Sequence, residues 1–274
     1  EQGKCFWLRV FQIPEGSKTS KGRPFQNLLQ LPNDDKVLTF IKVEDLGNVD
    51  FTENHFVVFA TRKGLIKKTT LHQYSRPRSN GINAITINEG DKLIEAKLTD
   101  GNSEIMIAKK SGDAIRFDES KVRPMGRTAA GVRGVRLSDK MEGDEVVGMI
   151  CVNKEDKETN VLVVSENGYG KRTDLDEYRI TNRGGKGVRS LKVTDKTGQL
   201  IAIKAVTEGN HLMIINKSGI TIRMQVDTIS TIGRNTQGVR LIKVPDGGAI
   251  ASVAKLEIMT DEENSEDILK DEEE

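Results

Sequence analysis

The stretch Gly131-Val-Arg-Gly-Val-Arg-Leu137 has two close counterparts later in the chain, Gly187-Val-Arg-Ser-Leu-Lys-Val193 and Gly238-Val-Arg-Leu-Ile-Lys-Val244. All three begin with a glycine and continue as a short, largely apolar run. Each also stands 19 residues after another glycine, namely Gly112, Gly168 and Gly219. Because sequence and spacing recur together, the chain is built from repeated modules.

The upstream glycine of each module lies in a predicted β-hairpin turn. Gly64 shows the pattern, with Phe56-Val-Val-Phe-Ala60 before it and Leu65-Ile-Lys-Lys-Thr69 after it. The pattern recurs at intervals of 48, 56 and 51 residues, and a polar residue precedes the glycine each time. Such dipeptides are typical of tight hairpin turns with a positive φ. Gly3 and Gly22 are again 19 residues apart, which indicates a fifth module.

A repeat of about 50 residues with roughly four strands and no helical periodicity predicts an all-β, propeller-like fold of four-stranded blades. A sandwich or a barrel would not require such a repeat. We place the modules at about residues 1–54, 55–102, 103–158, 159–209 and 210–257. The first module lacks its opening strand, so either the sequence is a fragment of a longer chain or a distant strand completes that blade.

Charge is unevenly distributed along the chain. The whole sequence has 42 Lys and Arg against 41 Asp and Glu, a formal net charge of +1. Residues 258–274 carry nine acidic residues and Lys270, a net charge of −8, which leaves residues 1–257 at +9. We expect the acidic segment to be a disordered tail, because it has no apolar periodicity. It could compete with an anionic partner for the basic body.

Several classes of protein are excluded by composition. No apolar run approaches the roughly 18 residues that span a bilayer, and Glu1-Gln2-Gly3-Lys4 does not resemble a signal peptide. Cys5 and Cys151 are far apart and have no Cys or His at metal-ligand spacing. The sequence therefore predicts no metal site and a reducing, cytoplasmic location.

Basic residues recur at fixed offsets from the module glycines. Four residues after the hairpin glycine stand Lys68, Arg116, Arg172 and Arg223. Two and five residues after the second glycine stand the pairs Arg133 and Arg136, Arg189 and Lys192, Arg240 and Lys243. Strand side chains alternate, so we expect offsets two and five to face opposite ways. A single such residue is ordinarily a solvated surface group, but repetition predicts a basic band that follows a phosphate backbone.

Glycine-rich loops with basic residues surround the second glycine of four modules. Glycines allow backbone N–H groups to approach an anion, although turns in the blades also require them. The loop Arg183-Gly184-Gly185-Lys186-Gly187 is the densest and the hardest to explain by turns alone. The basic residues of the other loops are Lys21, Arg23, Arg127 and Arg234.

Three motifs carry a resemblance to a known family: Val122-Arg-Pro-Met-Gly-Arg-Thr128, Ser165-Glu-Asn-Gly-Tyr-Gly-Lys-Arg-Thr173 and Ile232-Gly-Arg-Asn-Thr-Gln-Gly-Val239. With the module pattern, residues 3–257 resemble the C-terminal domain of the DNA gyrase A protein. The resemblance implies a six-bladed β-pinwheel, a propeller with altered blade connectivity, whose basic rim binds and bends double-stranded DNA. It also implies an A2B2 holoenzyme, formed with the gyrase B protein, that uses ATP and Mg²⁺ to introduce negative supercoils.

By this resemblance the chain starts in the second blade and lacks the first, which carries the motif Gln-Arg-Arg-Gly-Gly-Lys-Gly. Residues Thr181–Gly187 agree with that motif at five of seven positions. The resemblance therefore assigns DNA contacts to Arg183 and Lys186 in a box-like loop with Gly184, Gly185 and Gly187. It places strand cleavage and ATP hydrolysis in other regions, so we expect no catalytic residue and no cofactor in this fragment.

Two alternative functions remain open. The corresponding domain of topoisomerase IV shares the blade pattern, and the loop at Arg183 favours gyrase over it. A protein-binding propeller of the WD or kelch type is the other alternative. Those families need a recurring Trp-Asp pair or Gly-Gly with downstream aromatics in every blade, whereas Trp7 is the one tryptophan here.

Overall fold

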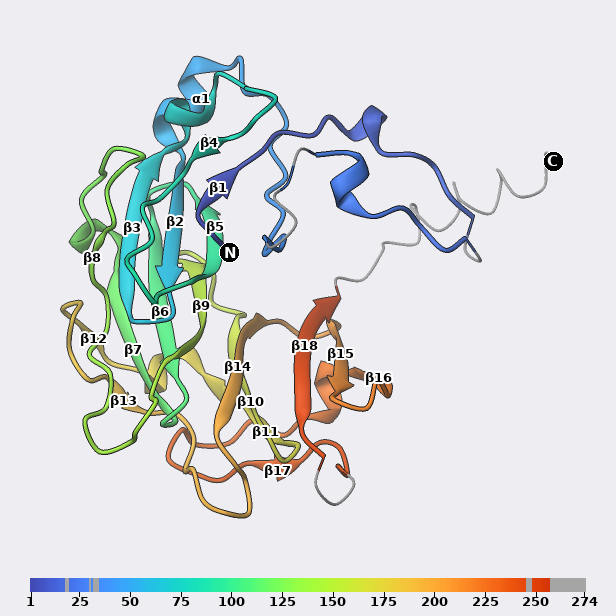
Figure 1. Cartoon of the computed structure of the whole chain (residues 1–274). Coiled ribbons are helices and arrows are strands. Elements are labelled where there is room, and N and C mark those ends of the chain that lie inside the picture. Colours follow the sequence, from blue (N-terminus) through green and yellow to red (C-terminus); the bar gives the residue numbers. More distant parts are fainter. Residues whose placement is uncertain (18–19, 30, 32–34, 245–247, 257–274) are drawn as a thin grey trace. The chain divides into compact units, whose positions relative to one another are not determined.

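The computed structural model describes residues 1–17, 20–29, 31, 35–244 and 248–256. The predicted acidic tail at 258–274 lies outside them. The chain forms two compact units (Figure 1). Unit 1 contains residues 1–109, 113–154 and 179–188, and unit 2 contains residues 110–112, 155–178 and the described residues from 189 onward.

Unit 1 contains three groups of paired strands. One is a two-stranded pair, and the other two are sheets built on the hairpins at Gly64 and Gly112. The pair is β1 (Lys4–Cys5) with β4 (Ile82–Asn83). The first sheet has the order β5 (Leu93–Thr99), β2 (Phe56–Thr61), β3 (Leu65–Thr70) and β8 (Val132–Arg133).

The second sheet of unit 1 has the order β12 (Ile180–Thr181), β7 (Asp113–Asp118), β6 (Ser103–Lys109) and β9 (Val146–Asn153), and β13 (Val188–Arg189) also pairs with β7. β12 runs parallel to β7. Short helices complete the unit: α1 (Val49–Asn54) and the 3-10 turns η1 (Val10–Gln12), η2 (Phe25–Asn27), η3 (Leu71–Tyr74) and η4 (Glu119–Lys121).

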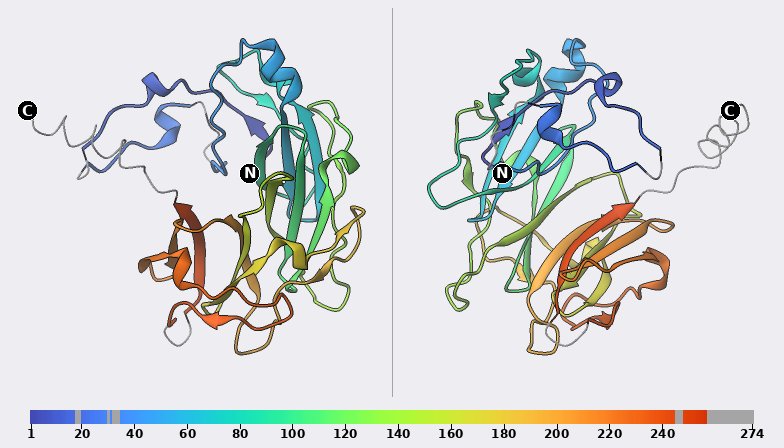
Figure 2. Two further views of the ribbon diagram at one scale, coloured as in Figure 1. Left: turned by 180° about the vertical axis from the view of Figure 1, so that it is seen from behind. Right: turned by 45° about the vertical axis from the view of Figure 1, so that its right-hand side comes forward.

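Unit 2 contains two antiparallel sheets. The first has the order β14 (Leu200–Val206), β10 (Asn160–Ser165), β11 (Tyr169–Asp174) and β17 (Val239–Arg240). The second has the order β16 (Thr221–Gln225), β15 (His211–Asn216) and β18 (Ile250–Leu256). The 3-10 turns η5 (Leu175–Glu177) and η6 (Val226–Thr228) follow the hairpins. Figure 2 shows these sheets from two further sides.

The cores of both units consist of side chains from the strand faces. In unit 1, Val58, Ile107 and Phe117 are fully buried in one cluster that joins its two large sheets. In unit 2, Leu162 and Ile214 occupy the corresponding positions of a second cluster. β5 and β9 pack together within unit 1, as do β14 and β18 within unit 2. The prediction of an all-β fold with hairpins at the repeat glycines is confirmed.

The fourth strand of each four-stranded arrangement comes from the following repeat. β8 pairs with β3, with Leu65 opposite Arg133 and Ile66 opposite Val132. β17 pairs with β11 in the same way. The modules at 55–102, 103–158, 159–209 and 210–257 each give three strands to their own sheet and one or two two-residue strands to the preceding arrangement. This is the altered connectivity that the resemblance implied.

The two glycines of the repeat make this exchange possible. The carbonyl oxygen of Gly64 accepts hydrogen bonds from the N–H groups of Gly134 (2.8 Å) and Val135 (3.2 Å). Gly131, with a φ of +100°, lies so close to β3 that a Cβ atom would stand 2.5 Å from the carbonyl oxygen of Ile66. The 19-residue spacing is thus the length of chain that carries the segments at Gly131, Gly187 and Gly238 from their own hairpins to the preceding sheet.

We predict that Gly131→Ala lowers the free energy of unfolding by at least about 3 kcal/mol, because backbone strain and a main-chain clash coincide there. Gly143→Ala is the matched control, since Gly143 has a φ of +71° but open space around its Cβ position. It should cost only about 1 kcal/mol. Urea unfolding measures both values, and equal losses would contradict the packing explanation.

Candidate nucleic-acid interface

The structure buries three of the four basic residues that stand four positions after a hairpin glycine and were predicted to form an exposed band. Lys68, Arg116 and Arg172 are only 5 to 8% exposed. The Lys68 Nζ atom lies 2.8 Å from a carboxylate oxygen of Glu119, and the Arg116 Nε atom donates to Glu104 at 2.6 Å. The prediction of an exposed band at this offset is therefore wrong for these three residues.

A segment from the next repeat covers this position in each case. Pro124 forms a parallel bridge with Lys68, Ile180 of β12 pairs with Arg116, and Thr231 forms a parallel bridge with Arg172. The Arg172 Nε atom donates to the carbonyl oxygen of Ile229 at 2.7 Å. The spacing of residues in the sequence could not reveal that these positions are covered, because the covering segment comes from the next repeat.

Arg223 is the exception, since its side chain is exposed. It belongs to β16, which pairs only with β15 among the described strands. Its Nε atom lies 3.0 Å from Nδ1 of His211. The absence of a covering segment among the described residues explains why this position alone is open.

The residues after the second glycine are exposed at both offsets. Arg133, Arg189 and Arg240 lie on the short outer strands, and Arg136, Lys192 and Lys243 follow them. Strand alternation does not govern both offsets, because β8, β13 and β17 are each only two residues long. The chain leaves strand geometry before the alternation reaches the fifth residue.

The box-like loop is attached to the turn after β8 in unit 1. The Arg183 side chain donates from Nε to the carbonyl oxygen of Lys121 and from Nη1 to that of Arg133, both at 3.0 Å. The N–H of Gly184 donates to Gly134, and the N–H of Arg136 donates to Gly185. We call the resulting group basic corner 1; it consists of Arg133, Arg136, Arg183 and Lys186.

Unit 2 repeats this arrangement. The Nη1 atom of Arg234 donates to the carbonyl oxygen of Arg189 at 3.0 Å, and the N–H of Lys192 donates to Thr236 at 2.9 Å. The backbone N–H of Arg234 donates to the Glu177 carboxylate at 2.8 Å. We call Arg189, Lys192 and Arg234 basic corner 2.

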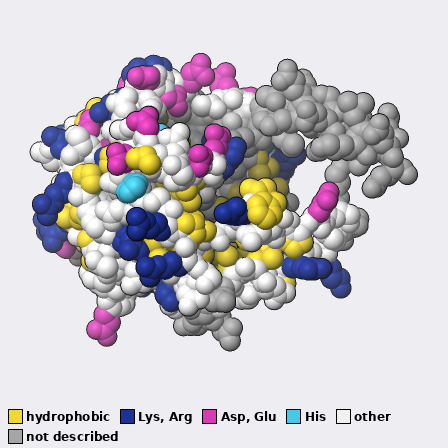
Figure 3. Space-filling view, turned by 90° about the horizontal axis from the view of Figure 1, so that it is seen from above, with side chains coloured by type: hydrophobic (Ala, Val, Ile, Leu, Met, Phe, Trp, Pro, Cys, Tyr) yellow, Lys and Arg dark blue, Asp and Glu magenta, His cyan; other side chains and the backbone are white. Residues whose placement is uncertain are grey.

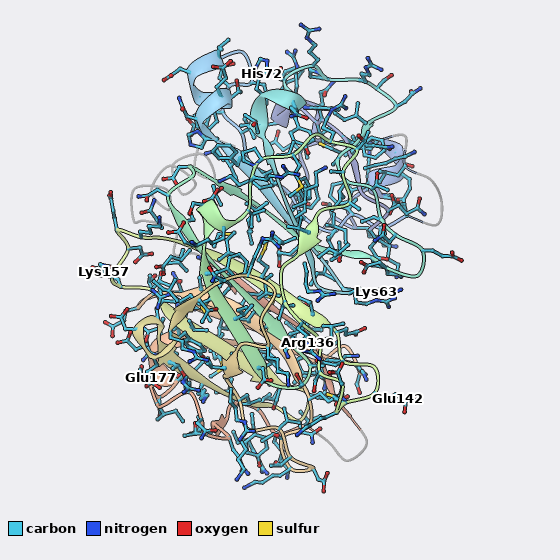
Figure 4. All side chains as sticks on the ribbon, turned by 90° about the vertical axis from the view of Figure 1, so that its left-hand side faces the viewer. Lys63, His72, Arg136, Glu142, Lys157 and Glu177 are labelled. Carbon is cyan, nitrogen blue, oxygen red and sulfur yellow. The ribbon has the colours of Figure 1, made fainter. Side chains whose placement is uncertain are left out.

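Both corners keep hydrogen-bond donors available. A guanidinium has five N–H groups, and Arg183 uses two of them within the described residues. Lys186, Arg189 and Arg136 are exposed. Figure 3 shows Lys and Arg side chains in groups on the face that it draws, and Figure 4 labels Arg136 and Glu177.

The remaining predicted residues lie in different environments. Lys21 and Arg23 are exposed in unit 1, and Arg127 is half-buried, with its backbone N–H donating to the side chain of Gln73. Arg240 donates from Nη2 to the Tyr169 hydroxyl at 2.8 Å and lies over its ring. The described residues contain no group of three His, Cys, Asp or Glu that could hold a metal ion.

Two lysines that the sequence analysis did not single out are fully buried. Lys67 and Lys171 are each three residues after a hairpin glycine. Burial and, to a smaller extent, the nearby Arg127 lower the pKa of Lys67 to about 8. Burial also lowers the pKa of Lys171 to about 8; Glu177 opposes this shift and Arg234 adds to it. The sequence did hold a signal for these buried lysines, because a lysine stands three residues after the hairpin glycine in two repeats.

These lysines predict a specific dependence of stability on pH. Their folded-state pKa values lie below the usual lysine value of 10.5, so between pH 8 and about 10.5 the unfolded chain binds more protons than the folded chain. Their contribution to the free energy of unfolding must rise across that range. Urea unfolding at pH 7.5 and 9.5 should show that the free energy of unfolding rises more for the wild type than for Lys67→Met/Lys171→Met. Equal rises would refute the lowered pKa values of these two lysines.

Comparison with known proteins identifies the family. A family model described as "DNA gyrase C-terminal domain, beta-propeller" matches residues 1–44, 55–100, 110–153, 159–207 and 210–257. The chain belongs to this family. As a member of the DNA gyrase C-terminal domain family, it is 44% identical over 255 residues to the A subunit of DNA gyrase from Staphylococcus epidermidis, with 93% of the chain and 28% of that protein covered.

A second relative, the A subunit of DNA gyrase from Staphylococcus aureus, is 43% identical over 266 residues, covering 97% of the chain and 29% of the relative. The chain thus spans less than a third of these relatives. Among solved structures, a DNA gyrase A C-terminal domain matches with a TM-score of 0.77 and 26% identity, over 93% of the chain and 80% of that structure.

The C-terminal domain of DNA topoisomerase IV matches with a TM-score of 0.85 at 24% identity, over all of the chain and 82% of that structure; this likeness concerns the fold alone. In the described part of this gyrase-family chain, no helix has the length and apolar character needed to cross a membrane.

Proposed function

We propose that the chain binds double-stranded DNA without sequence preference and bends it, as part of the gyrase A protein. The observation that carries this proposal is the repetition of one basic corner in two successive repeats. In each corner an arginine on a glycine-rich loop is fixed by hydrogen bonds to backbone carbonyls, beside other exposed basic residues. Membership of the gyrase C-terminal domain family supports it.

The chemistry of the corners suits phosphate rather than base recognition. Lys and Arg neutralise phosphates and release counterions, a contribution to affinity that carries no sequence information. Neither corner includes an aromatic residue that could stack on a base or enter a base step. Bending 20 to 30 base pairs by 40 to 90° costs on the order of 1 to 6 kcal/mol, which additional phosphate contacts must offset.

The wider activity follows as part of the same proposal. Bent DNA would support negative supercoiling by an A2B2 gyrase at the bacterial chromosome in the cytoplasm. ATP and Mg²⁺ would act in other parts of that holoenzyme, and we assign no catalytic step to this chain. The curated relatives at 42 to 44% identity are gyrase proteins, so we favour gyrase over topoisomerase IV.

Binding should weaken steeply with salt and differ little between duplexes of unrelated sequence. Arg133→Ala and Arg189→Ala should each reduce the slope of log affinity against log salt by about 1, since each removes one phosphate contact. Fluorescence anisotropy on two 30-base-pair duplexes measures this.

Arg172→Met is the matched control, because it removes a buried guanidinium of the same charge. Its slope should equal that of the wild type. The proposal would be overturned if Arg172→Met reduced the salt slope more than Arg133→Ala does, or if the chain strongly preferred one of the two duplexes.

A further inference from the structure

Two arginine-bearing loops rest on buried lysine side chains. Lys171 extends from β11 beneath the loop that carries Arg234, and Lys67 extends from β3 beneath the loop that carries Arg127. Both side chains are 0% exposed. A fully buried ammonium is costly unless every N–H has an acceptor, so its partners indicate what it holds in place.

All of the hydrogen bonds from the Lys171 ammonium go to one loop. Its Nζ atom lies 2.7 Å from the carbonyl oxygen of Gly233, 2.5 Å from that of Arg234 and 3.0 Å from Oγ1 of Thr236. The Thr236 hydroxyl in turn donates to Gly233 at 2.9 Å. Because Lys171 is anchored in a sheet, these bonds fix the backbone from which Arg234 projects.

Lys67 makes the corresponding contacts in unit 1. Its Nζ atom lies 2.5 Å from the carbonyl oxygen of Arg127 and 2.6 Å from that of Ala84. The ammonium also lies 5.7 Å from the centre of the Phe59 ring. The same offset is thus used twice to hold the main chain of a loop arginine.

The fold does not itself require a lysine here. The equivalent residue of β7 is Ile115, which is also buried. The loop above it is held instead by the Arg183 side chain and by the N–H of Gly184. If the sheet itself required a lysine at this position, the hairpins at Gly64, Gly112 and Gly168 would all have one. Lys67 and Lys171 therefore have a role confined to their own loops.

We propose that Lys171 and Lys67 are positioning residues that hold the Arg234 and Arg127 loops in their DNA-binding form while charged, and release them when they lose a proton. This inference rests on the proposed DNA binding. An ammonium donates up to three hydrogen bonds strengthened by its charge, whereas a neutral amine donates two uncharged and weaker ones, so loss of the proton weakens the hold on the loop carbonyl groups.

The lowered pKa values of both lysines, about 8, place this change just above neutral pH. The charged groups that face Lys171 are Glu177 and Arg234, and the one that faces Lys67 is Arg127. The Tyr74 hydroxyl shares the Ala84 carbonyl with Lys67, and burial raises the pKa of Tyr74, so it stays neutral here. As the pH rises above 8, DNA affinity must therefore fall while the contribution of the two lysines to the free energy of unfolding rises. The opposite directions distinguish release of the loops from unfolding of the protein.

The test measures binding of the full chain to a 30-base-pair duplex by anisotropy at pH 6.5, 7.5, 8.5 and 9.5 and constant salt. We expect wild-type affinity to fall about threefold to tenfold between pH 7.5 and 9.5, the size of a lost phosphate contact. Lys67→Met/Lys171→Met should be weaker at pH 7.5 and independent of pH. Hydrogen exchange at residues 233–237 should accelerate in Lys171→Met.

Lys243→Met is the control that matches Lys171→Met in charge, because it removes one lysine from an exposed position. It should bind more weakly at every pH but keep the wild-type pH dependence. Lys171→Arg and Lys67→Arg, which keep the charge and do not titrate, should restore affinity at pH 7.5 without pH dependence.

A pH-independent wild type, or a double variant that keeps the wild-type dependence, would overturn the inference. Failure of the arginine variants to restore affinity while melting cooperatively would also overturn it. Absence of wild-type binding at pH 6.5 and low salt would instead refute the proposed function.

Discussion

The carbonyl groups of the hairpin glycines Gly64, Gly112 and Gly168 each accept two backbone hydrogen bonds from a neighbouring repeat, and the rest of the structure depends on this pair of bonds. Gly168, for example, receives the N–H groups of Leu241 and Ile242 at 2.9 and 3.3 Å. The bonds hold a two-residue strand against the hairpin edge, which would otherwise expose unpaired backbone groups. They require glycine on both sides, because a side chain at Gly168 or Gly238 would meet main-chain oxygen 2.5 Å away.

This exchange also determines which basic residues reach solvent. The arriving segment covers the second strand of the hairpin, so Arg116 and Arg172 become buried and find acceptors inside the protein. The basic residues of the arriving segment itself, such as Arg133 and Arg189, are exposed to solvent. Charge on the surface of one sheet is therefore supplied by the next repeat along the chain.

The sequence predicted much of the fold because glycine spacing reports directly on turns. The hairpins at Gly64, Gly112 and Gly168 and the all-β class follow from that spacing. The origin of the outer strand could not be predicted from local pattern, since β8 and β3 are separated by more than 60 residues. The burial of Lys68 was misjudged for the same reason, whereas Arg183 lies in a fixed basic loop, as its glycine neighbours indicated.

We propose that the loop and outer-strand arginines, rather than the buried arginines of the hairpins, contact the phosphate backbone of DNA. Arginine Nε–H resonances, followed by nuclear magnetic resonance during titration with a duplex, test this directly. We expect the resonances of Arg133, Arg183, Arg189 and Arg234 to shift and those of Arg116 and Arg172 to stay unchanged. Shifts at Arg116 and Arg172 with no change at Arg183 and Arg234 would contradict it.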